Sequence, residues 1–152
     1  MKARLFTDGG ARGNPGPAGI GVVLLGEDDV LIYRLARSLG ESTNNVAEYS
    51  ALIAGLEAAL ERGVTDLEVF VDSELVVHQV QGEWKIKTEH LRPLAVKAKA
   101  LLGRFPAAVI EHVPRSLNAE ADELANEAMD AAAGGSDLLV EKVEQRSMFD
   151  PR

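Results

Sequence analysis

The sequence predicts an α/β fold in which helices flank a five-stranded mixed sheet of three antiparallel and then two parallel strands. Two observations favour it: five short β-type runs, and apolar residues at helical spacing in the segments around the later runs. A full helix is expected between the third and fourth strands, so the first and fourth strands can lie parallel and adjacent through a right-handed crossover. The first strand then lies at a topological switch point, where α/β sheets usually bind ligands.

The first three strands are predicted at residues 2–7, 19–25 and 30–37. Residues 9–17 are rich in glycine and proline, which predicts a loop between the first two strands. Residues 26–29 predict a hairpin turn between the second and third strands. These three strands therefore form the antiparallel part of the sheet.

The later elements supply the parallel strands and the helices. A helix is predicted to open at residues 42–45 and to end at Gly63, with Asn45 and Glu48 as a capping box unless Glu48 is turned toward a metal instead. After it come a strand at residues 67–71, a short helix after Asp72, a helix at 91–105, a strand at 107–113, and a last helix that is capped by Asn118 and runs to residue 129.

Composition indicates one soluble domain. The chain has 152 residues, of which 46% are apolar and 26% charged, and it shows no internal repeat. No apolar run reaches the ~18–20 residues of a membrane helix, no signal-peptide pattern opens the chain, and cysteine is absent. These features favour the cytoplasm and no membrane contact. A net charge of −8 argues against nonspecific attraction to nucleic acid, which depends on Lys and Arg.

Four acidic residues are predicted to meet in space. Asp8 and Asp72 follow two neighbouring strand ends, and Glu48 and Asp122 each lie one turn inside a helix. Carboxylate oxygens are the ligands that Mg²⁺ prefers, and two such ions ~4 Å apart can clamp the attacking and leaving oxygens of a phosphodiester. Without cations these acids would repel one another. The alternative is that four of the 24 acidic residues only look aligned.

Five motifs surround these acids. They are Thr7-Asp8-Gly9-Gly10, Gly13-Asn14-Pro15-Gly16-Pro17-Ala18-Gly19, Thr43-Asn44-Asn45-Val46-Ala47-Glu48, Val71-Asp72-Ser73 and Asn118-Ala119-Glu120-Ala121-Asp122-Glu123-Leu124-Ala125. In identity and order they resemble the signatures of type 1 ribonuclease H. The resemblance covers residues 1–133, and it implies a ribonuclease H domain with the ribonuclease H-like fold over that range.

The resemblance implies a metal-dependent endonuclease that cuts the RNA strand of RNA–DNA hybrids. Asp8, Glu48, Asp72 and Asp122 match the family's four metal-binding carboxylates, which hold two Mg²⁺ or Mn²⁺ ions during catalysis. An activated water would attack the RNA phosphate in line, leaving a 5′-phosphate and a 3′-hydroxyl.

The resemblance also implies contacts to the hybrid. Asn14, Asn44 and Asn45 match positions in the minor groove, where the 2′-hydroxyl distinguishes RNA from DNA. Thr43 matches a residue that holds a DNA phosphate, and Ser73 matches a position near the substrate backbone. Structural roles stay open for all five, since Asn14 before proline can shape a turn and the other four can cap helices.

The sequence departs from the family pattern in the loop before the last acid. Many members carry a histidine there, whereas this loop has Arg115, and His112 falls inside the predicted strand. An arginine cannot act as a general base at neutral pH, but it can stabilise phosphate charge or help to expel product. Whether Arg115 replaces the histidine is a hypothesis.

A second departure is the absence of the basic helix and loop that several members insert before the long helix. Only residues 81–88 fill this space, and they include Trp84, Lys85 and Lys87. Trp84 with its two lysines can lie along the DNA strand, or Trp84 can pack under the loop. We expect this protein to bind the hybrid less tightly than members with the insert do, and its activity to be more sensitive to salt.

Residues 134–152 read as a C-terminal tail without a core pattern. Residues 137–143 either add an edge strand or stay disordered. The segment Gln145-Arg146-Ser147-Met148-Phe149 resembles the peptide by which bacterial replication proteins dock on the sliding clamp, because it places a glutamine before spaced apolar anchors.

Three functions follow from the sequence. The first is the hybrid-specific endonuclease, expected as a monomer. The second is a hybrid-binding module of the same fold with weak or no cleavage, favoured by the missing histidine and insert. The third is a nuclease of this fold that acts on another substrate, such as DNA junctions.

Overall fold

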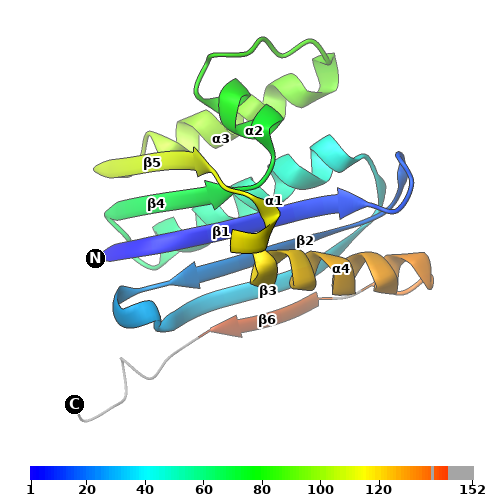
Figure 1. Ribbon diagram of the computed structural model, residues 1–152, viewed down its shortest axis with the longest axis horizontal. Helices are drawn as coiled ribbons and strands as arrows, with labels where there is room; N and C mark the ends of the chain where they lie inside the picture. Colours follow the sequence, from blue (N-terminus) through cyan, green and yellow to red (C-terminus); the bar gives the residue numbers. More distant parts are fainter. Residues whose placement is uncertain (138, 144–152) are drawn as a thin grey trace.

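One mixed sheet runs through the computed structural model, which describes residues 1–137 and 139–143 (Figure 1). Its six strands lie in the order β5-β4-β1-β2-β3-β6. The strands are β1 (Lys2–Ala11), β2 (Gly16–Leu25), β3 (Leu31–Ser42), β4 (Asp66–Val71), β5 (Ala107–His112) and β6 (Leu139–Val143). The helices are α1 (Asn44–Glu61), α2 (Glu74–Val80), α3 (Arg92–Leu102) and α4 (Ala119–Ala133), with short 3-10 turns η1 (Glu27–Asp29), η2 (Glu89–Leu91) and η3 (Arg115–Leu117).

The predicted topology is confirmed. β1 pairs antiparallel with β2 and parallel with β4, and β4 pairs parallel with β5. In the β1–β4 register Thr7 lies opposite Val71. Because Asp8 and Asp72 each follow one of these paired residues, the register brings the two carboxylates to the same point of the sheet.

The sheet has six strands, so the predicted count of five is wrong. β6 pairs antiparallel with β3, and the Tyr33 hydroxyl donates a 2.5 Å hydrogen bond to Glu141 Oε2. Leu139 and Val140 are exposed on this edge strand. The segment therefore lacks the apolar pattern by which a buried strand is predicted from sequence. Of the predicted tail, the clamp-like segment of residues 145–149 lies outside the described residues and stays a prediction.

The glycine-rich segment is mostly strand, which corrects the loop predicted for residues 9–17. β1 continues to Ala11 and β2 begins at Gly16, so only residues 12–15 lie outside the two strands of this hairpin. A Cβ on Gly9 would lie 2.2 Å from the Ala47 carbonyl oxygen in α1, and one on Gly21 would lie 2.1 Å from that of Ala121 in α4. These glycines therefore let helices approach the sheet closely on both of its faces.

The start of α1 also differs from the prediction. Thr43 is the N-cap, and its Oγ1 accepts a 3.2 Å hydrogen bond from the Val46 amide. The expected capping box of Asn45 and Glu48 is wrong, because Glu48 Oε1 instead accepts a 2.8 Å hydrogen bond from the Gly9 amide. The helix predicted at residues 91–105 is shorter, with η2 before it and α3 ending at Leu102.

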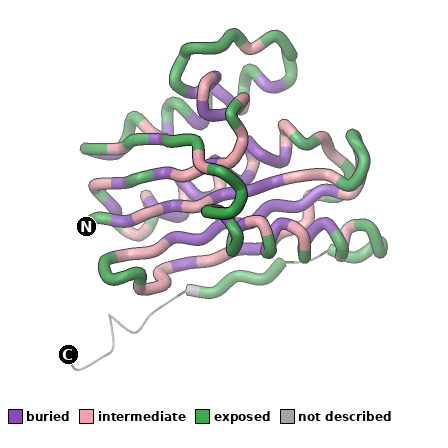
Figure 2. The backbone as a smooth tube through the Cα atoms, in the orientation of Figure 1, coloured by how far each residue is buried: buried purple, intermediate pink, exposed green. Residues whose placement is uncertain are grey.

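The main core lies between the sheet and α1. Figure 2 shows buried residues along the central strands and the inner helix faces, and exposed residues at the hairpin tip and in the segment between α2 and α3. Leu5, Val69, Leu52 and Leu56 have no exposed surface. Burial of these side chains drives folding and holds α1 against β1 and β2. Within the described part of the chain, no helix combines the length and apolar content needed to cross a membrane.

Candidate active site

Three carboxylates meet where β1, β4 and α1 converge. Asp8 belongs to β1, Asp72 follows β4, and Glu48 lies in the second turn of α1. Each offers one oxygen such that the three oxygens lie within 4.8 Å of one another. The sequence prediction that strand ends and a helical turn unite these acids agrees with this geometry.

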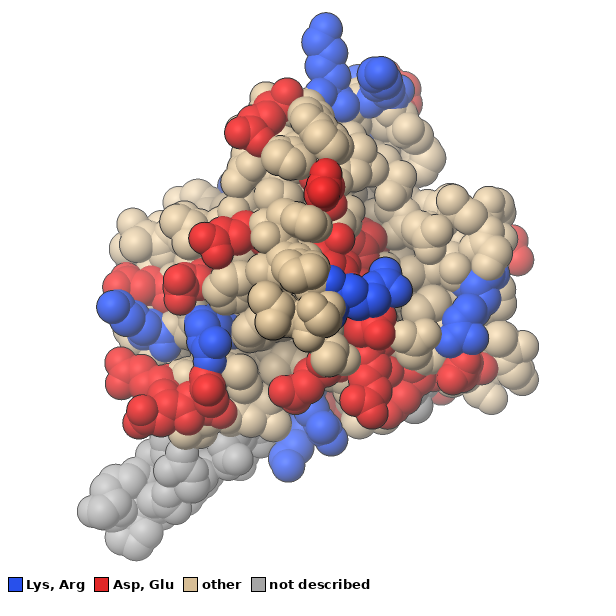
Figure 3. Space-filling model, viewed as in Figure 1, with Lys and Arg blue, Asp and Glu red and all other residues tan. Residues whose placement is uncertain are grey.

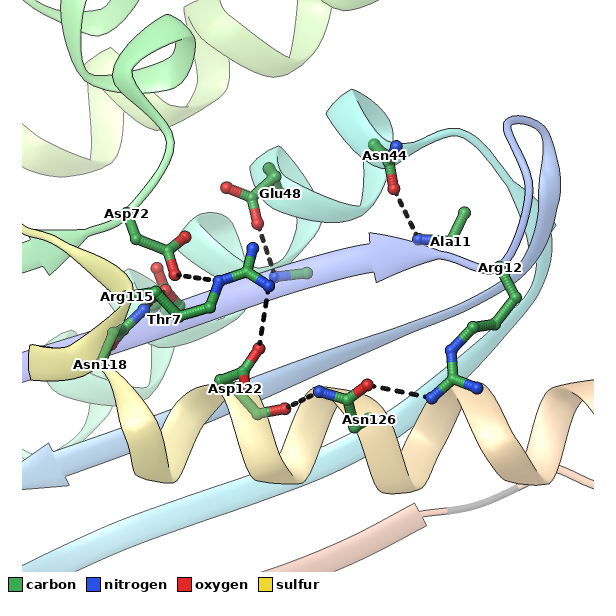
Figure 4. A network of polar contacts seen from close by, with 11 residues as sticks. Thr7, Ala11, Arg12, Asn44, Glu48, Asp72, Arg115, Asn118, Asp122 and Asn126 are labelled. Carbon is green, nitrogen blue, oxygen red and sulfur yellow. Dashed lines mark hydrogen bonds and ion pairs between the residues drawn. The ribbon is translucent and has the colours of Figure 1, made fainter.

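Asp122 and Arg115 complete the cluster from the other side. Asp122 lies in the first turn of α4, and Arg115 in η3 points its guanidinium between two acids (Figure 4). Arg115 Nε lies 3.6 Å from Asp72 Oδ2, and its NH1 lies 3.8 Å from Asp122 Oδ1. These distances are those of ion pairs without good hydrogen bonds. His112 ends β5 and is exposed, as expected of a sheet-face residue.

Burial shifts the titration of two of the acids. Asp8 is 4% exposed and Glu48 is 8% exposed. Desolvation, followed by the charge of Glu48, raises the pKa of Asp8 from 3.8 to about 10. Desolvation also raises the pKa of Glu48 from 4.5 to about 7, against the hydrogen bonds from Asp8 and the Gly9 amide. Without a cation, this pair therefore holds a proton at neutral pH.

The polar atoms of the site fit a divalent cation. Glu48 Oε2 and Asp72 Oδ2 are buried and accept no hydrogen bond from the described residues, and of the two only Asp72 Oδ2 forms an ion pair, with Arg115 at 3.6 Å. A buried carboxylate oxygen in this state is costly unless a cation balances it. All the candidate ligands are hard oxygen donors, the type that Mg²⁺ binds. These residues could hold one or two such ions.

Asn118 links the start of α4, which carries Asp122, to β1, which carries Asp8. It occupies the N-cap position of α4, but its side chain does not cap the helix, which corrects that prediction. Its Nδ2 donates a 2.9 Å hydrogen bond to the Thr7 carbonyl instead, and the side chain is 1% exposed. The residue before Asp8 is thus tied to the helix that carries Asp122.

Two of the three asparagines predicted to contact substrate, Asn14 and Asn44, bind the hairpin to α1. The Asn44 amide donates a 3.1 Å hydrogen bond to Asn14 Oδ1, and the Ala11 amide donates a 2.8 Å bond to Asn44 Oδ1. Asn44, Asn45 and Ser73 line a cavity of about 380 Å³ with the four acids. Thr43 and Ser73 cap α1 and α2 through their hydroxyl groups. Structural roles thus exist for Asn14, Asn44, Thr43 and Ser73, and contact of these residues and of Asn45 with substrate stays a prediction.

Trp84, Lys85 and Lys87 lie away from the acids, in a separate groove of about 560 Å³ that Asn45 also lines. Trp84 is 45% exposed and stacks on His78, with ring centroids 4.4 Å apart. One side of the indole ring is therefore supported by protein, and the side chain does not pack under the loop. Asn45 borders both cavities, so the groove lies next to the acidic site.

Two side chains at the site were not predicted from the sequence. Arg12 donates a 2.9 Å hydrogen bond to Asn126 Oδ1 and forms a 2.8 Å ion pair with Asp130. Asn126 Nδ2 in turn donates to the Asp122 carbonyl at 2.8 Å. The spacing of four residues from Asp122 places Asn126 on the same helix face, and this was the available signal. Together they tie the hairpin to α4 (Figure 4).

Comparison with known proteins places this site in a family. A family model described as "Reverse transcriptase-like" matches residues 6–128. Bifunctional protein Rv2228c of Mycobacterium tuberculosis is 49% identical over 134 residues, 88% of this chain and 37% of that protein. The solved N-terminal RNase H domain of Rv2228c, a fusion with maltose binding protein, has a TM-score of 0.86 at 48% identity, covering 89% of this chain and 98% of that one.

Two further relatives agree. Ribonuclease HI of Halobacterium salinarum is 46% identical over 131 residues, 86% of this chain and 66% of that protein. LC11-RNase H1, isolated from compost by a metagenomic approach, was solved in complex with an RNA/DNA hybrid; it has a TM-score of 0.80 at 47% identity, covering 86% of this chain and 98% of that one. This chain spans 37% of the length of the mycobacterial protein. On fold, motifs and identity, it belongs to the type 1 ribonuclease H family.

Proposed function

We propose that this protein is an endonuclease that hydrolyses the RNA strand of RNA–DNA hybrids and leaves 5′-phosphate and 3′-hydroxyl ends. The observation that carries the proposal is the cluster of Asp8, Glu48 and Asp72, each of which offers one oxygen within 4.8 Å of the others. Glu48 and Asp72 each also have a buried oxygen without a hydrogen-bond partner among the described residues. The hybrid bound by LC11-RNase H1 supports the choice of substrate.

The four carboxylates would hold the ions on which the reaction depends. Asp8, Glu48 and Asp72 offer the central oxygens, and Asp122 faces them from α4. Two bound Mg²⁺ or Mn²⁺ ions would activate the attacking water and stabilise charge on the leaving oxygen. The bonds from Gly9 to Glu48 and from Asn118 to the Thr7 carbonyl fix the carboxylates in place before substrate arrives.

Arg115 would act on the phosphate. Its guanidinium pairs with Asp72 and Asp122, and its side chain is 73% exposed. With the carboxylates engaged in holding their ions, the guanidinium would be free to turn from these ion pairs toward the substrate phosphate. Arginine is suited to stabilise phosphate charge in the transition state or to repel the cations as product leaves.

The hybrid would lie across both cavities. Asn14, Asn44, Asn45 and Ser73 would contact its backbone and minor groove beside the acids, and Thr43 would hold a DNA phosphate. Trp84, Lys85 and Lys87 would follow the DNA strand along the second groove, with the exposed indole face against sugars. Figure 3 shows acidic side chains widely spread over the visible face and a basic group over the segment between α2 and α3. The positive charge that would attract the hybrid is therefore confined to a small part of the surface, in keeping with the net charge of −8.

A substrate comparison tests the proposal. Labelled RNA–DNA hybrid, duplex DNA and duplex RNA are each incubated with the protein and Mg²⁺, beside the Asp8→Asn variant. Cleavage of the hybrid alone, lost in the variant, supports the proposal. Binding without cleavage would favour the hybrid-binding module instead, and cleavage of duplex DNA would favour another nuclease. A monomeric, cytoplasmic enzyme stays a prediction.

A further inference from the structure

The segment between α2 and α3 has little regular structure of its own. Residues 82–88, here called the α2–α3 loop, are exposed except for Ile86, and they carry Trp84, Lys85 and Lys87. A loop with so few buried apolar contacts is expected to open easily unless polar bonds hold it. The bonds that fix this loop therefore decide whether the groove exists before substrate binds.

His78 makes the first set of these bonds. Its carbonyl accepts hydrogen bonds from the Glu83 amide at 2.9 Å and the Trp84 amide at 3.2 Å. Its ring stacks on Trp84, and its Nδ1 lies 2.5 Å from Glu83 Oε1. These contacts join the first half of the loop to the C-terminal turn of α2, but they do not reach α1.

Gln79 makes the link to α1. Its side chain is 3% exposed, and its Oε1 accepts a 2.7 Å hydrogen bond from the Tyr49 hydroxyl. Its Nε2 donates a longer, 3.4 Å bond to the Lys85 carbonyl. Tyr49 is fully buried in α1, directly after Glu48 and one turn after Asn45. A continuous chain of polar contacts thus runs from the helix of the acidic site to the lysine of the loop.

We propose that Gln79 is a positioning residue for substrate: through Tyr49 and the Lys85 carbonyl it holds the α2–α3 loop at a fixed distance from α1, so that the groove is formed in advance. The inference rests on the proposed function, because it assigns this groove to the hybrid. Gln79, Asn45, Trp84 and Lys85 all line the groove, and Gln79 forms part of its wall.

The chemistry of the position favours this role over a purely structural one. A buried amide must be hydrogen-bonded to offset its desolvation, and an apolar side chain of the same volume would fill the same space at no such cost. Replacing both members of a buried polar pair by apolar groups is often nearly neutral for stability. A methionine at this position could fill the space but could not hold the loop through a hydrogen bond. The amide of Gln79 therefore indicates a positioning role.

The test uses two variants and a matched control. Gln79→Met removes the amide, and the double variant Tyr49→Phe with Gln79→Met removes both polar partners and leaves no buried group unsatisfied. The control is Gln81→Met, which makes the same change at the C-cap of the same helix, where Nε2 binds the Ile110 carbonyl in β5 and not the loop. Circular dichroism melts establish that each variant is folded.

For both test variants we expect KM for the hybrid to rise about 3- to 10-fold while kcat stays within about twofold, since uniform binding and not transition-state stabilisation is lost. Trp84 is the only tryptophan, so its fluorescence reports the loop directly. Acrylamide should quench it about twice as efficiently in the test variants, and as in the wild type in Gln81→Met.

An unchanged KM in the folded double variant would overturn the proposal, and so would a fall in kcat at constant KM, which would place the effect at Glu48. Unchanged quenching of Trp84 would overturn it as well. The quenching measurement needs no substrate, so it distinguishes failure of this inference from failure of the proposed hybrid cleavage.

Discussion

The side chain of Asn118 donates a 2.9 Å hydrogen bond to the backbone carbonyl of Thr7, across 111 positions of the chain. Thr7 precedes Asp8, and Asn118 precedes the first turn of α4, which carries Asp122. Two carboxylates from opposite ends of the sequence therefore depend on one buried amide for their relative position. The site is held by bonds to the backbone beside the acids, in addition to contacts among the acids themselves.

Asn118→Ala should lower both stability and activity. The substitution leaves the Thr7 carbonyl without its donor in a buried position, so the free energy of unfolding should fall by about 1–3 kcal/mol. Because α4 can then shift relative to β1, kcat on the hybrid should fall more than KM rises. Urea denaturation and steady-state kinetics measure the two effects. Asn126→Ala, at a half-buried position, is the control and should lower stability and activity less. Equal losses in the two variants would show that the Asn118 bond has no particular role in positioning the acids.

Asp8 makes the stability of the metal-free protein depend on pH. Burial raises its pKa from 3.8 to about 10, so over that interval the folded state keeps a proton that the unfolded state releases. Stability then falls as pH rises from about 4. Glu48 acts in the same direction between 4.5 and about 7. Asp8→Asn removes the larger effect, and in EDTA it should be more stable than the wild type by about 1–3 kcal/mol near neutral pH.

The difference in the free energy of unfolding between Asp8→Asn and the wild type should be larger at about pH 8 than at about pH 5. The gain comes from removing a carboxyl that resists ionisation. Mg²⁺ should reverse the order by stabilising the wild type, since the ion binds the ionised carboxylates of the folded state. Urea denaturation at both pH values, with EDTA and with Mg²⁺, measures these effects. A gain that is the same at both pH values would contradict the assignment of the raised pKa to Asp8.

Arg115→Ala should slow the chemical step. Loss of the guanidinium that faces Asp72 and Asp122 should lower kcat about 100- to 1,000-fold at saturating hybrid, the range for removal of one charge-stabilising group. Arg115→Lys keeps the charge and should retain part of the rate. Single-turnover and steady-state rates separate chemistry from product release. A rate near that of the wild type for Arg115→Ala would exclude the hypothesis that it replaces the loop histidine.

Trp84 and its two lysines should determine how tightly the hybrid binds. Trp84→Ala removes an exposed stacking surface and should raise KM about tenfold. Replacing Lys85 and Lys87 by alanine should reduce the slope of log affinity against log salt by about 2, or about one unit for each phosphate contact. Lys97→Ala, at an exposed lysine of α3 that pairs with Glu57, is the control. An unchanged salt slope in the double lysine variant would place these residues outside the binding surface.

The sequence predicted those parts of the site in which the order of the strands alone brings acidic residues together. Asp8 and Asp72 could be placed together because parallel neighbouring strands end at one edge, and that geometry follows from order alone. Gly9 was misread because glycine predicts a loop, whereas here it allows a helix to touch a strand. β6 was left open because its exposed edge position has no burial pattern. The bonds of Gln79 and Asn118 join segments far apart in sequence, and no local pattern encodes such partners.

The nature of the product ends tests the central claim most directly. Purified protein is incubated with an RNA–DNA hybrid in EDTA or Mg²⁺, beside Asp8→Asn, and the fragments are identified by mass spectrometry. Hydrolysis through metal ions on the four carboxylates predicts fragments with 5′-phosphate and 3′-hydroxyl ends, formed only by the wild type and only with the metal. Cleavage in EDTA, 2′,3′-cyclic phosphate ends, or equal cleavage by Asp8→Asn would contradict it.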